Sequence, residues 1–340
     1  MTVYFILIFC LIILTYFCEN KWSFVAAIVL LLLIGGFRDV SVGTDSKNYL
    51  SLFESYGADI GSLNHANEPL YMAIQLFSAI TGLGYGGMQF ISMLVMLVGL
   101  GFVLYRWSAN PVYSVLAYVL LYFYFNSFNT MRQYMAVPFV LLSYYYLSIS
   151  NIKKYLLCIF IATMFHFTAL ISLVVWPLSM MRIKKDPLIL LLMMSFVIGM
   201  TPLAQWITQL LSQHFSAFSF YATDSQEYRS SLFSLSRLLL NIYTLFLLTW
   251  LREKDNMLLI LVIGVGMLNL FSFQPVIGRL AQYFTIIQII IIPSLPSLVI
   301  KKTNNQALVL GSLAYMCLTW LYLISSNVGE VVPWKYGGLL

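Results

Sequence analysis

Residues 24–34 read FVAAIVLLLLI, an unbroken apolar run that suits the middle of a bilayer. The run stops abruptly, because the stretch at residues 35–54, GGFRDVSVGTDSKNYLSLFE, is rich in polar and charged side chains. These side chains are Arg38, Asp39, Asp45, Lys47, Tyr49 and Glu54. An apolar helix that ends in such a cluster predicts a membrane span followed by an ordered segment at the membrane surface.

The whole chain has the composition of a membrane protein. Of its 340 residues, 61% are hydrophobic and 9% are charged, and the mean hydropathy is +0.88. A soluble domain carries about 25% charged residues. The 23 Tyr, 25 Phe and 7 Trp residues suit aromatic belts at the two membrane interfaces. We therefore predict a polytopic membrane protein.

Cysteines and net charge indicate neither a metal site nor a nucleic-acid partner. The four cysteines lie in or beside apolar runs, and none has C-x-x-C spacing, so we expect no disulfide frame, no metal and no cofactor. They are Cys10, Cys18, Cys158 and Cys317. The net charge of +6 comes from basic residues that punctuate the apolar runs, where they orient a membrane protein.

The chain contains twelve apolar runs close to the roughly 20 residues that a helix needs to cross the hydrocarbon core. They lie at 2–18, 22–37, 69–82, 86–105, 111–126, 133–149, 155–178, 187–208, 235–251, 256–273, 280–300 and 306–324. The first run lacks a basic start and a cleavage site, so we expect a retained span and not a signal peptide. The sequence predicts an all-α transmembrane bundle of about 12 membrane segments in a single integral membrane domain, 1–340.

Two connections, 38–68 and 209–234, are too long for simple turns, and we expect them to be ordered external loops. Clusters of basic residues should mark the cytoplasmic ends of the helices, which places both loops on the opposite face. These clusters are Lys21, Arg182 with Lys184 and Lys185, Arg252 with Lys254, and Lys301 with Lys302.

One part of this topology conflicts with the charge rule. Five full crossings after the first loop would leave Lys153 and Lys154 outside and Arg132 inside. In an alternative topology, one short early segment does not cross, and 155–178 enters the membrane and returns, with His166 near its turn. Broken helices of this kind occur where they line a cavity.

Ionisable side chains at membrane depth are costly and are therefore candidates for function. Arg38 and Asp39 qualify, although an interfacial charge pair would explain them as well. Asp45 also suits an Asx turn or a helix N-cap. Glu68 stands directly before Pro69, which ordinary helix capping would explain.

The stretch FYFNSFNTMRQYMAVPFV at residues 123–140 is harder to explain by capping. Polar residues interrupt a long apolar region there, and Arg132 close to a proline predicts a helix that breaks or starts inside the protein. The polar residues are Asn126, Asn129, Arg132 and Gln133. Two more candidates follow: His166 among apolar neighbours, and Arg279 with Tyr283 near a helix start. The competing explanation for His166 is a buried structural histidine, and that for Arg279 is an interfacial cation that snorkels to the membrane surface.

This set of residues suits glycosyl transfer from a lipid-linked pyrophosphate. Arginine binds phosphate bidentately, and a carboxylate can activate a sugar hydroxyl as a general base. Aromatic side chains can pack against sugar rings. A transporter would also place paired charges at membrane depth, so this class stays open.

An ordered set of motifs resembles the EpsG-like family of bacterial polysaccharide polymerases, which includes many O-antigen polymerases of the Wzy type. The motifs are FRD, VGTDSKNYLSLFE, EPLY, NTMRQYMAVPFVLLSYYYL, a KK pair, FHFTALI, R..QYF and VPWKY. The matching positions are Arg38, Asp39, Gly43, Asp45, Tyr49, Glu68, Pro69, Arg132, Gln133, His166, Arg279 and Tyr283. Trp334 departs from the more usual proline-tyrosine pairing in the last motif.

The resemblance implies a bacterial inner-membrane enzyme whose active site faces the periplasm. Such enzymes transfer a growing chain onto the next undecaprenyl-diphosphate-linked oligosaccharide repeat and release undecaprenyl diphosphate. They need neither a nucleotide sugar nor a metal. The implied partners are the lipid-linked oligosaccharide, membrane lipids and a chain-length regulator protein, with no nucleic acid.

The roles of individual residues follow as a hypothesis. Arg38 and Arg279, with Arg132, would hold the donor pyrophosphate, and Gln133, Tyr49 and Tyr283 would complete the substrate-binding set. Asp45, or failing it Asp39 or Glu68, would deprotonate the acceptor hydroxyl, and His166 would handle protons. A lipid-linked oligosaccharide flippase and an O-antigen ligase are the alternative functions.

Overall fold

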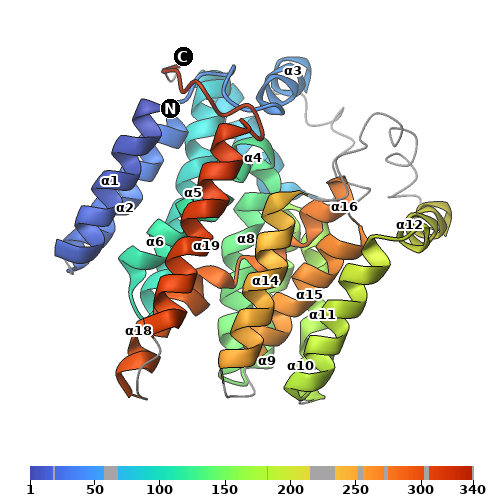
Figure 1. The fold of residues 1–340 in the computed structure, drawn as a ribbon. Coiled ribbons are helices and arrows are strands. Elements are labelled where there is room, and N and C mark those ends of the chain that lie inside the picture. The colour runs from blue at the N-terminus through green and yellow to red at the C-terminus, as the bar shows by residue number, and fades with distance from the viewer. Residues whose placement is uncertain are drawn as a thin grey trace. The chain divides into compact units, whose positions relative to one another are not determined.

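A computed structural model describes residues 1–17, 20–56, 68–181, 183–214, 234–251, 256–271, 275–301 and 306–338. Regular secondary structure in these ranges is helical, which confirms the predicted all-α class for the described residues (Figure 1). The helices form two compact units, which are described separately. The first contains Met1–Leu170, Ile289–Lys301 and Met316–Leu340, and the second contains Ile171–Gln288 and Lys302–Tyr315. The single integral membrane domain, 1–340, stays a prediction.

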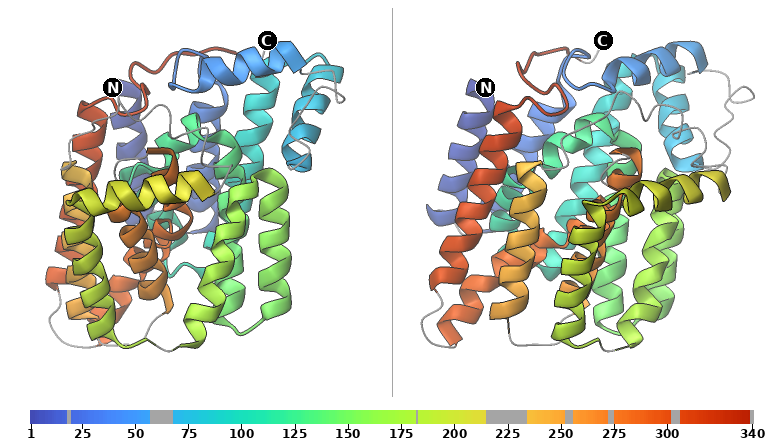
Figure 2. Two further views of the ribbon diagram at one scale, coloured as in Figure 1. Left: turned by 90° about the vertical axis from the view of Figure 1, so that its right-hand side faces the viewer. Right: turned by 45° about the vertical axis from the view of Figure 1, so that its right-hand side comes forward.

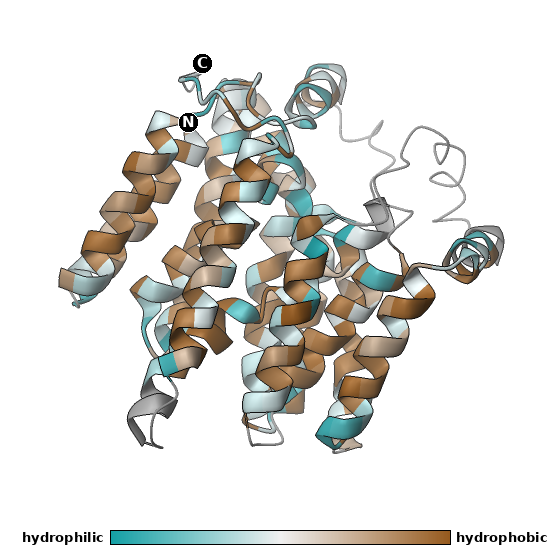
Figure 3. Cartoon of the chain, in the orientation of Figure 1, coloured by the Kyte–Doolittle hydropathy of each residue, from teal (hydrophilic) through white to brown (hydrophobic). Residues whose placement is uncertain are grey.

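The first unit begins with the helix pair α1 (Thr2–Phe17) and α2 (Lys21–Gly36). Asn20 caps α2, because its side-chain oxygen accepts hydrogen bonds from the backbone N–H groups of Trp22 and Ser23. The outward faces of both helices are apolar (Figure 3), with exposed side chains such as Phe9 and Phe17. Exposed apolar faces of this kind are expected where helices contact lipid.

Helices α3 (Ser46–Tyr56), α4 (Pro69–Ile80) and α5 (Gly84–Trp107) follow. Pro69 occupies the first turn of α4, as predicted, because its missing N–H would have no partner there in any case. α5 packs against α2, α4 and α8 (Met131–Ser148), and it therefore forms the centre of the first unit.

The predicted run 111–126 is broken in the structure. Helix α6 (Pro111–Leu120) and helix α7 (Phe123–Asn129) meet at a bend of 59°. Tyr122 occupies the bend with a φ of 69°. A second break follows at Thr130, and α8 starts directly after it, so a helix does start beside Arg132 as predicted.

A third break lies at His166, the residue near which the alternative topology places its turn, and re-entry of 155–178 into the membrane stays a prediction. Helix α9 (Ile152–Phe165) ends there, and His166 adopts an extended conformation with φ −154° and ψ 113°. The chain continues as the 3-10 helix η1 (Phe167–Val174) and then helix α10 (Val175–Met180). The predicted run 155–178 is therefore three short elements.

The second unit is built around α15 (Asn256–Leu270). This helix packs against several others of the unit. They are α10, α11 (Lys185–Gly199), α14 (Leu235–Trp250), α16 (Pro275–Leu280) and α17 (Gln282–Thr285). α12 (Pro202–His214) follows α11 after a break at Met200 and Thr201, so the predicted run 187–208 is also interrupted.

Buried amides join three helices of the second unit. Asn241 of α14 and Asn269 of α15 exchange two hydrogen bonds of 2.9 Å between their side-chain amides. Asn269 also donates to the hydroxyl of Ser195 on α11 at 3.0 Å. Inside a membrane-type helical bundle, such pairs replace water as the partner of polar side chains.

The last two helices, α18 (Gln288–Lys301) and α19 (Gln306–Ser325), each contribute residues to both units. Three helical segments in the described ranges are long and apolar enough to cross a membrane: Gly84–Trp107, Gly278–Pro296 and Gln306–Ser325. The bent pair α6 and α7 would make a fourth, and six further apolar helices are shorter. The structure thus supports a multi-pass helical membrane protein, but about twelve spans are not confirmed.

The two predicted external loops are only partly described. Region 38–68 contains α3, and its residues 57–67 lie outside the described residues. Region 209–234 begins inside α12, and its residues 215–233 also lie outside them.

The C-terminal tail, residues 326–337, lies along the α2–α3 loop, residues 37–45. The two segments are at the same end of the first unit (Figure 2). Arg38 and Tyr336 form an isolated antiparallel bridge. The N–H of Asp39 donates to the carbonyl of Lys335 at 2.9 Å, and the N–H of Gly337 donates to the carbonyl of Phe37 at 3.0 Å. These bonds hold loop and tail together along their backbones.

The amide pair in the second unit leads to a stability prediction. Asn269→Leu leaves the amide of Asn241 without its reciprocal partner, and we expect a lower melting temperature, equivalent to about 1 kcal/mol or more. Thermal unfolding in detergent measures this loss. The double variant Asn241→Leu/Asn269→Leu should lose less than the sum of the two single variants, because it leaves no unpaired amide. Additive losses would contradict the pairing.

Candidate functional site

The site is centred on the Glu68 carboxylate at the start of α4. Pro69 fixes the first turn of the helix, and the Glu68 side chain makes no capping hydrogen bond to it. The side chain is only 8% exposed. A buried carboxylate needs hydrogen-bond donors, and Glu68 finds them on other helices.

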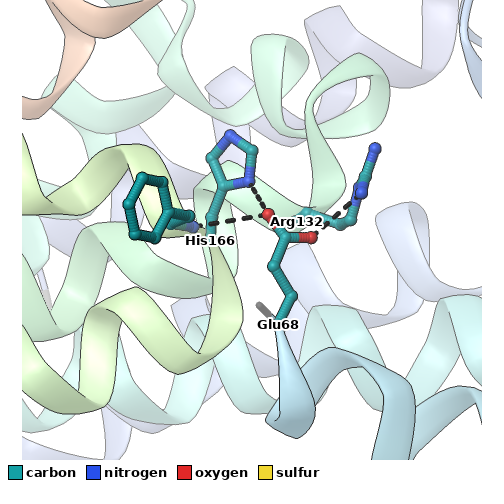
Figure 4. Close-up of polar contacts among 4 residues, drawn as sticks. Glu68, Arg132 and His166 are labelled. Carbon is teal, nitrogen blue, oxygen red and sulfur yellow. Dashed lines mark hydrogen bonds and ion pairs between the residues drawn. The ribbon is translucent and has the colours of Figure 1, made fainter. Parts of the chain in front are cut away.

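Two side chains meet this carboxylate from opposite sides (Figure 4). Arg132 Nη1 donates to Glu68 Oε2 at 2.9 Å. His166 Nδ1 lies 2.6 Å from Glu68 Oε1, and the backbone N–H of Phe167 donates to the same oxygen at 3.3 Å. Both carboxylate oxygens are therefore engaged, each by a different element of the first unit.

Interrupted helices bring these groups together. Arg132 stands in the first turn of α8, immediately after the break at Thr130. His166 occupies the extended position between α9 and η1. The break frees the N–H of Phe167, which continuous helix would have bonded four residues back. The site thus depends on helix ends and not on the faces of continuous helices.

Electrostatics keep Glu68 ionised. Burial alone would raise its pKa, but the hydrogen bond to His166, the charge of Arg132 and the N–H of Phe167 outweigh burial. The pKa of Glu68 is lowered as a result. The carboxylate is a permanent anion at neutral pH, able to hold an imidazole N–H and a guanidinium in place.

The partners of Glu68 remain partly accessible. The side chains of Arg132 and His166 are 24% and 23% exposed. The guanidinium of Arg132 lies 5.4 Å from the ring centre of Tyr71 and 5.9 Å from that of Tyr49. Its Nε has no hydrogen-bond partner in the structure. The arrangement buries the anion and leaves parts of the cation and the imidazole for a further ligand.

Arg38 has a different environment. Its side chain is buried, with the residue 2% exposed. The guanidinium donates to the carbonyl of Gly35 at 2.6 Å and to that of Phe128 at 3.3 Å, and it lies 4.5 Å from the centre of the Phe128 ring. Arg38 therefore binds the end of α2 to α7, and its predicted role in pyrophosphate binding stays a prediction.

Asp39 and Asp45 belong to the α2–α3 loop. Asp39 accepts a hydrogen bond from the N–H of Ser41 at 2.9 Å. Its pKa is lowered, chiefly by its hydrogen bonds to Ser41. Asp45 is half-buried, and its N–H donates to the side-chain oxygen of Asn129 at 3.3 Å. Among the three predicted carboxylates, Glu68 is the one that the described structure brings together with His166 and Arg132.

The other predicted residues divide between the two units. Gln133 is buried on α8, next to Arg132, and Tyr49 is buried beside the Arg132 guanidinium. Arg279 is half-buried at the end of α16, and Tyr283 is buried in α17, both in the second unit. Within the first unit the structure brings together Glu68, Arg132, His166 and Tyr49, and the predicted roles of Arg279 and Tyr283 stay predictions.

Gln89 of α5 was not predicted from the sequence. Its side-chain nitrogen donates to the carbonyls of Arg38 and Gly36, at 2.8 and 3.2 Å. A polar residue in the apolar run 86–105 was the available signal, since buried polar groups in membrane helices normally have a specific partner. Among the described residues, no three His, Cys, Asp or Glu side chains form a group that could hold a metal ion.

Comparison with known proteins gives the family. The model of the EpsG family matches residues 21–336, nearly the whole chain. The protein belongs to the EpsG family. The match includes Glu68, Arg132, His166 and most of the tail, so both the site and the tail segment that binds the α2–α3 loop lie within the EpsG region. No curated protein and no solved structure matches the chain.

Membership of the EpsG family confirms the resemblance found in the sequence motifs. Together with the apolar helices, it identifies the chain as a multi-pass membrane protein related to polysaccharide polymerases. The reaction and its substrate are taken up below.

The lowered pKa of Glu68 leads to a prediction on pH and stability. Its folded pKa lies below the usual value of about 4.3, so its stabilising effect is complete above that value and is lost as the pH falls through the folded pKa. Thermal unfolding between pH 7 and 3 should therefore show a steeper acid loss for the wild type than for Glu68→Gln. Exposed Glu54 provides the matched control, because Glu54→Gln should keep the wild-type profile. Parallel profiles for wild type and Glu68→Gln would contradict the assignment.

Proposed function

We propose that the protein is an O-antigen-type polysaccharide polymerase of the bacterial inner membrane. It would join undecaprenyl-diphosphate-linked oligosaccharide repeats at the periplasmic face and release undecaprenyl diphosphate. The observation that carries this proposal is the Glu68 carboxylate held between His166 Nδ1 and Arg132 Nη1. The pair supplies a base and a cation beside one another, which is what glycosyl transfer from a lipid diphosphate requires.

His166 is the proposed general base. With Nδ1 bonded to Glu68, the imidazole is fixed as the tautomer that carries its proton on Nδ1, and Nε2 is left to accept one. In Figure 4 the second ring nitrogen lies away from the carboxylate. Nε2 would take the proton of the acceptor hydroxyl, while Glu68 stabilises the imidazolium that forms.

The transfer step is balanced without another reactant. The acceptor oxygen forms a bond to the anomeric carbon of the donor sugar, and the bond from that carbon to the diphosphate oxygen breaks. The electron pair leaves with undecaprenyl diphosphate, and the acceptor proton goes to His166. The site must therefore stabilise an anionic leaving group as well as remove a proton.

Arg132 is the proposed partner of that leaving group. Guanidinium groups stay charged when partly desolvated and bind phosphate oxygens with several N–H groups. One nitrogen of Arg132 is held by Glu68, and the side chain keeps 24% of its surface exposed, so the group is fixed but still accessible. Tyr49 and Tyr71 are buried beside it, with their ring centres 5.9 and 5.4 Å from the guanidinium. Electrostatic support of this kind is often the largest contribution to catalysis.

This proposal replaces the hypothesis that Asp45 is the base. The hydrogen bonds of Asp39 serve the turn at Ser41, and the backbone of Asp45 is tied to Asn129. Glu68 is the carboxylate that contacts His166, at 2.6 Å. Glu68 acts through His166, so its role is to orient the base and not to touch the acceptor.

The proposal predicts a large loss of polymerisation when His166 or Glu68 is changed, and a small one when Asp45 is changed. His166→Gln keeps a hydrogen-bond donor near Glu68 but removes the base, and we expect polymerisation to fall about 100- to 10,000-fold. Glu68→Gln should also be severely impaired, whereas Asp45→Asn should stay within a few-fold of wild type. The assay is polymerisation of a synthetic undecaprenyl-diphosphate-linked repeat by purified protein in lipid nanodiscs, with products separated as a ladder.

The same assay distinguishes the alternative functions. Full ladders from His166→Gln at normal protein levels would overturn the assignment of the base. No ladder from wild type, together with transfer of a finished chain to lipid A core, would indicate a ligase. Movement of the lipid-linked repeat across vesicles without any new glycosidic bond would indicate a flippase.

A further inference from the structure

Asn129, the last residue of α7, joins three segments that are distant in the sequence. Its Nδ2 donates to the carbonyl of Gly329 in the tail at 3.1 Å. Its Oδ1 accepts from the hydroxyl of Thr44 at 3.0 Å and from the N–H of Asp45 at 3.3 Å. The residue is nearly buried, and the one amide group therefore binds tail, α2–α3 loop and helix end at once.

Two glycines make room for this amide. Gly43 has a φ of 110° and Gly329 a φ of 75°, a region that favours glycine. A Cβ on Gly329 would collide with Asn129 Nδ2, and a Cβ on Gly43 would lie 2.9 Å from Asn129 Oδ1. The backbone of both segments is thus shaped around the Asn129 side chain.

Direct backbone bonds complete the junction. The N–H of Thr44 donates to the carbonyl of Gly329, and the N–H of Gly43 donates to that of Glu330, both at 3.1 Å. Gly329 O consequently accepts from Thr44 and from Asn129. The α2–α3 loop and the tail are thus bonded to each other, and both are bonded to the end of α7.

The junction lies next to the part of the chain that carries Arg132. Only Thr130 and Met131 separate Asn129 from it, and Thr130 forms the break between α7 and α8. Arg38 binds the carbonyl of Phe128 at 3.3 Å, so the last two residues of α7 are both held. A short helix that is held at its end fixes the direction in which the next helix begins.

We propose that Asn129 is a positioning residue, which fastens the tail and the α2–α3 loop to α7 and thereby sets Arg132 against Glu68. The catalytic consequence rests on the proposed function, because it assumes that Arg132 binds the donor diphosphate. The binding of the tail and loop to α7, and its effect on the Arg132–Glu68 ion pair, do not depend on the proposed function. The experiment below tests the two parts separately.

Asn129→Asp is the informative variant. An aspartate keeps acceptor oxygens for Thr44 and Asp45 but cannot donate to Gly329, so it removes the bond from Asn129 to the tail, sets a carboxylate against the Gly329 carbonyl and loosens the tail at this point. Asn151→Asp is the matched control, because Asn151 caps α9 through its oxygen, which accepts from the N–H of Lys154 at 3.1 Å. Should Asn129→Asp not fold, Thr44→Val removes a single bond to the same amide and takes its place.

Release of the tail is measured by thiol labelling. Val331 is fully buried in the tail. In a protein whose four native cysteines are replaced by alanine, Val331→Cys should react with a maleimide at least ten-fold faster when Asn129→Asp is added. The Asn151→Asp control should leave the labelling rate unchanged. An unchanged rate with Asn129→Asp would overturn the fastening.

The effect on Arg132 is measured in two ways. In thermal unfolding, the melting-temperature cost of Glu68→Gln should fall by about half in the Asn129→Asp background, since a misplaced Arg132 has less of its ion pair to lose. In the ladder assay, Asn129→Asp should lower kcat/KM for the lipid-linked repeat about ten- to 100-fold, mainly through KM, at normal protein levels. Additive melting-temperature costs would overturn the positioning role.

The outcomes separate the two proposals. If wild type makes no polymer but the labelling rate and the coupled melting temperatures change as expected, the proposed function fails and the positioning of Arg132 stands. If wild type polymerises and Asn129→Asp leaves kcat, KM and the coupling unchanged, the positioning role fails and the proposed function stands.

Discussion

The structure of the first unit depends on one buried charge, the Glu68 carboxylate. A charge removed from water is costly unless donors surround it, and a chain that has few polar residues must collect those donors from separate helices. Glu68 draws them from the start of α8 and from the break after α9. Because Arg132 and His166 must both reach it, their helices have to begin or end at this point. The breaks in these helices thus supply the hydrogen-bond donors that the buried carboxylate needs.

Every break in a membrane helix frees backbone groups that need partners. In this chain, side chains supply many of them. Arg38 donates to the carbonyls of Gly35 and Phe128, which lie in the last turns of α2 and α7. An arginine at the end of an apolar run can therefore serve the fold as readily as a substrate. The same residue type has two uses here, since Arg38 contacts backbone while Arg132 contacts a carboxylate.

The helical class and the position of several breaks could be predicted from the sequence. Apolar runs interrupted at Arg132 and His166 indicated where helices start and end, and both breaks are present. The choice among Asp39, Asp45 and Glu68 could not be made, because each has a local explanation: an interfacial charge pair for Asp39, and turn or capping chemistry for Asp45 and Glu68. What separates them is the meeting of residues 68, 132 and 166, which no local pattern encodes. The bend at Tyr122 was missed for a related reason, since its hydroxyl bonds Val328 at 2.9 Å, far along the chain.

The tail binds residues that are synthesised much earlier than itself. The partner of Asn129 at Gly329 lies 200 residues further along the chain, and that of Tyr4 at Val331 lies 327 residues further. During synthesis, the α2–α3 loop and α7 are made well before the tail residues that bind them. A ribosome-bound chain therefore contains Glu68, Arg132 and His166 before it contains the tail that binds the α2–α3 loop and α7. The hydrogen bonds from the tail to Tyr4 and Asn129 therefore form only after residues 329–331 have been synthesised.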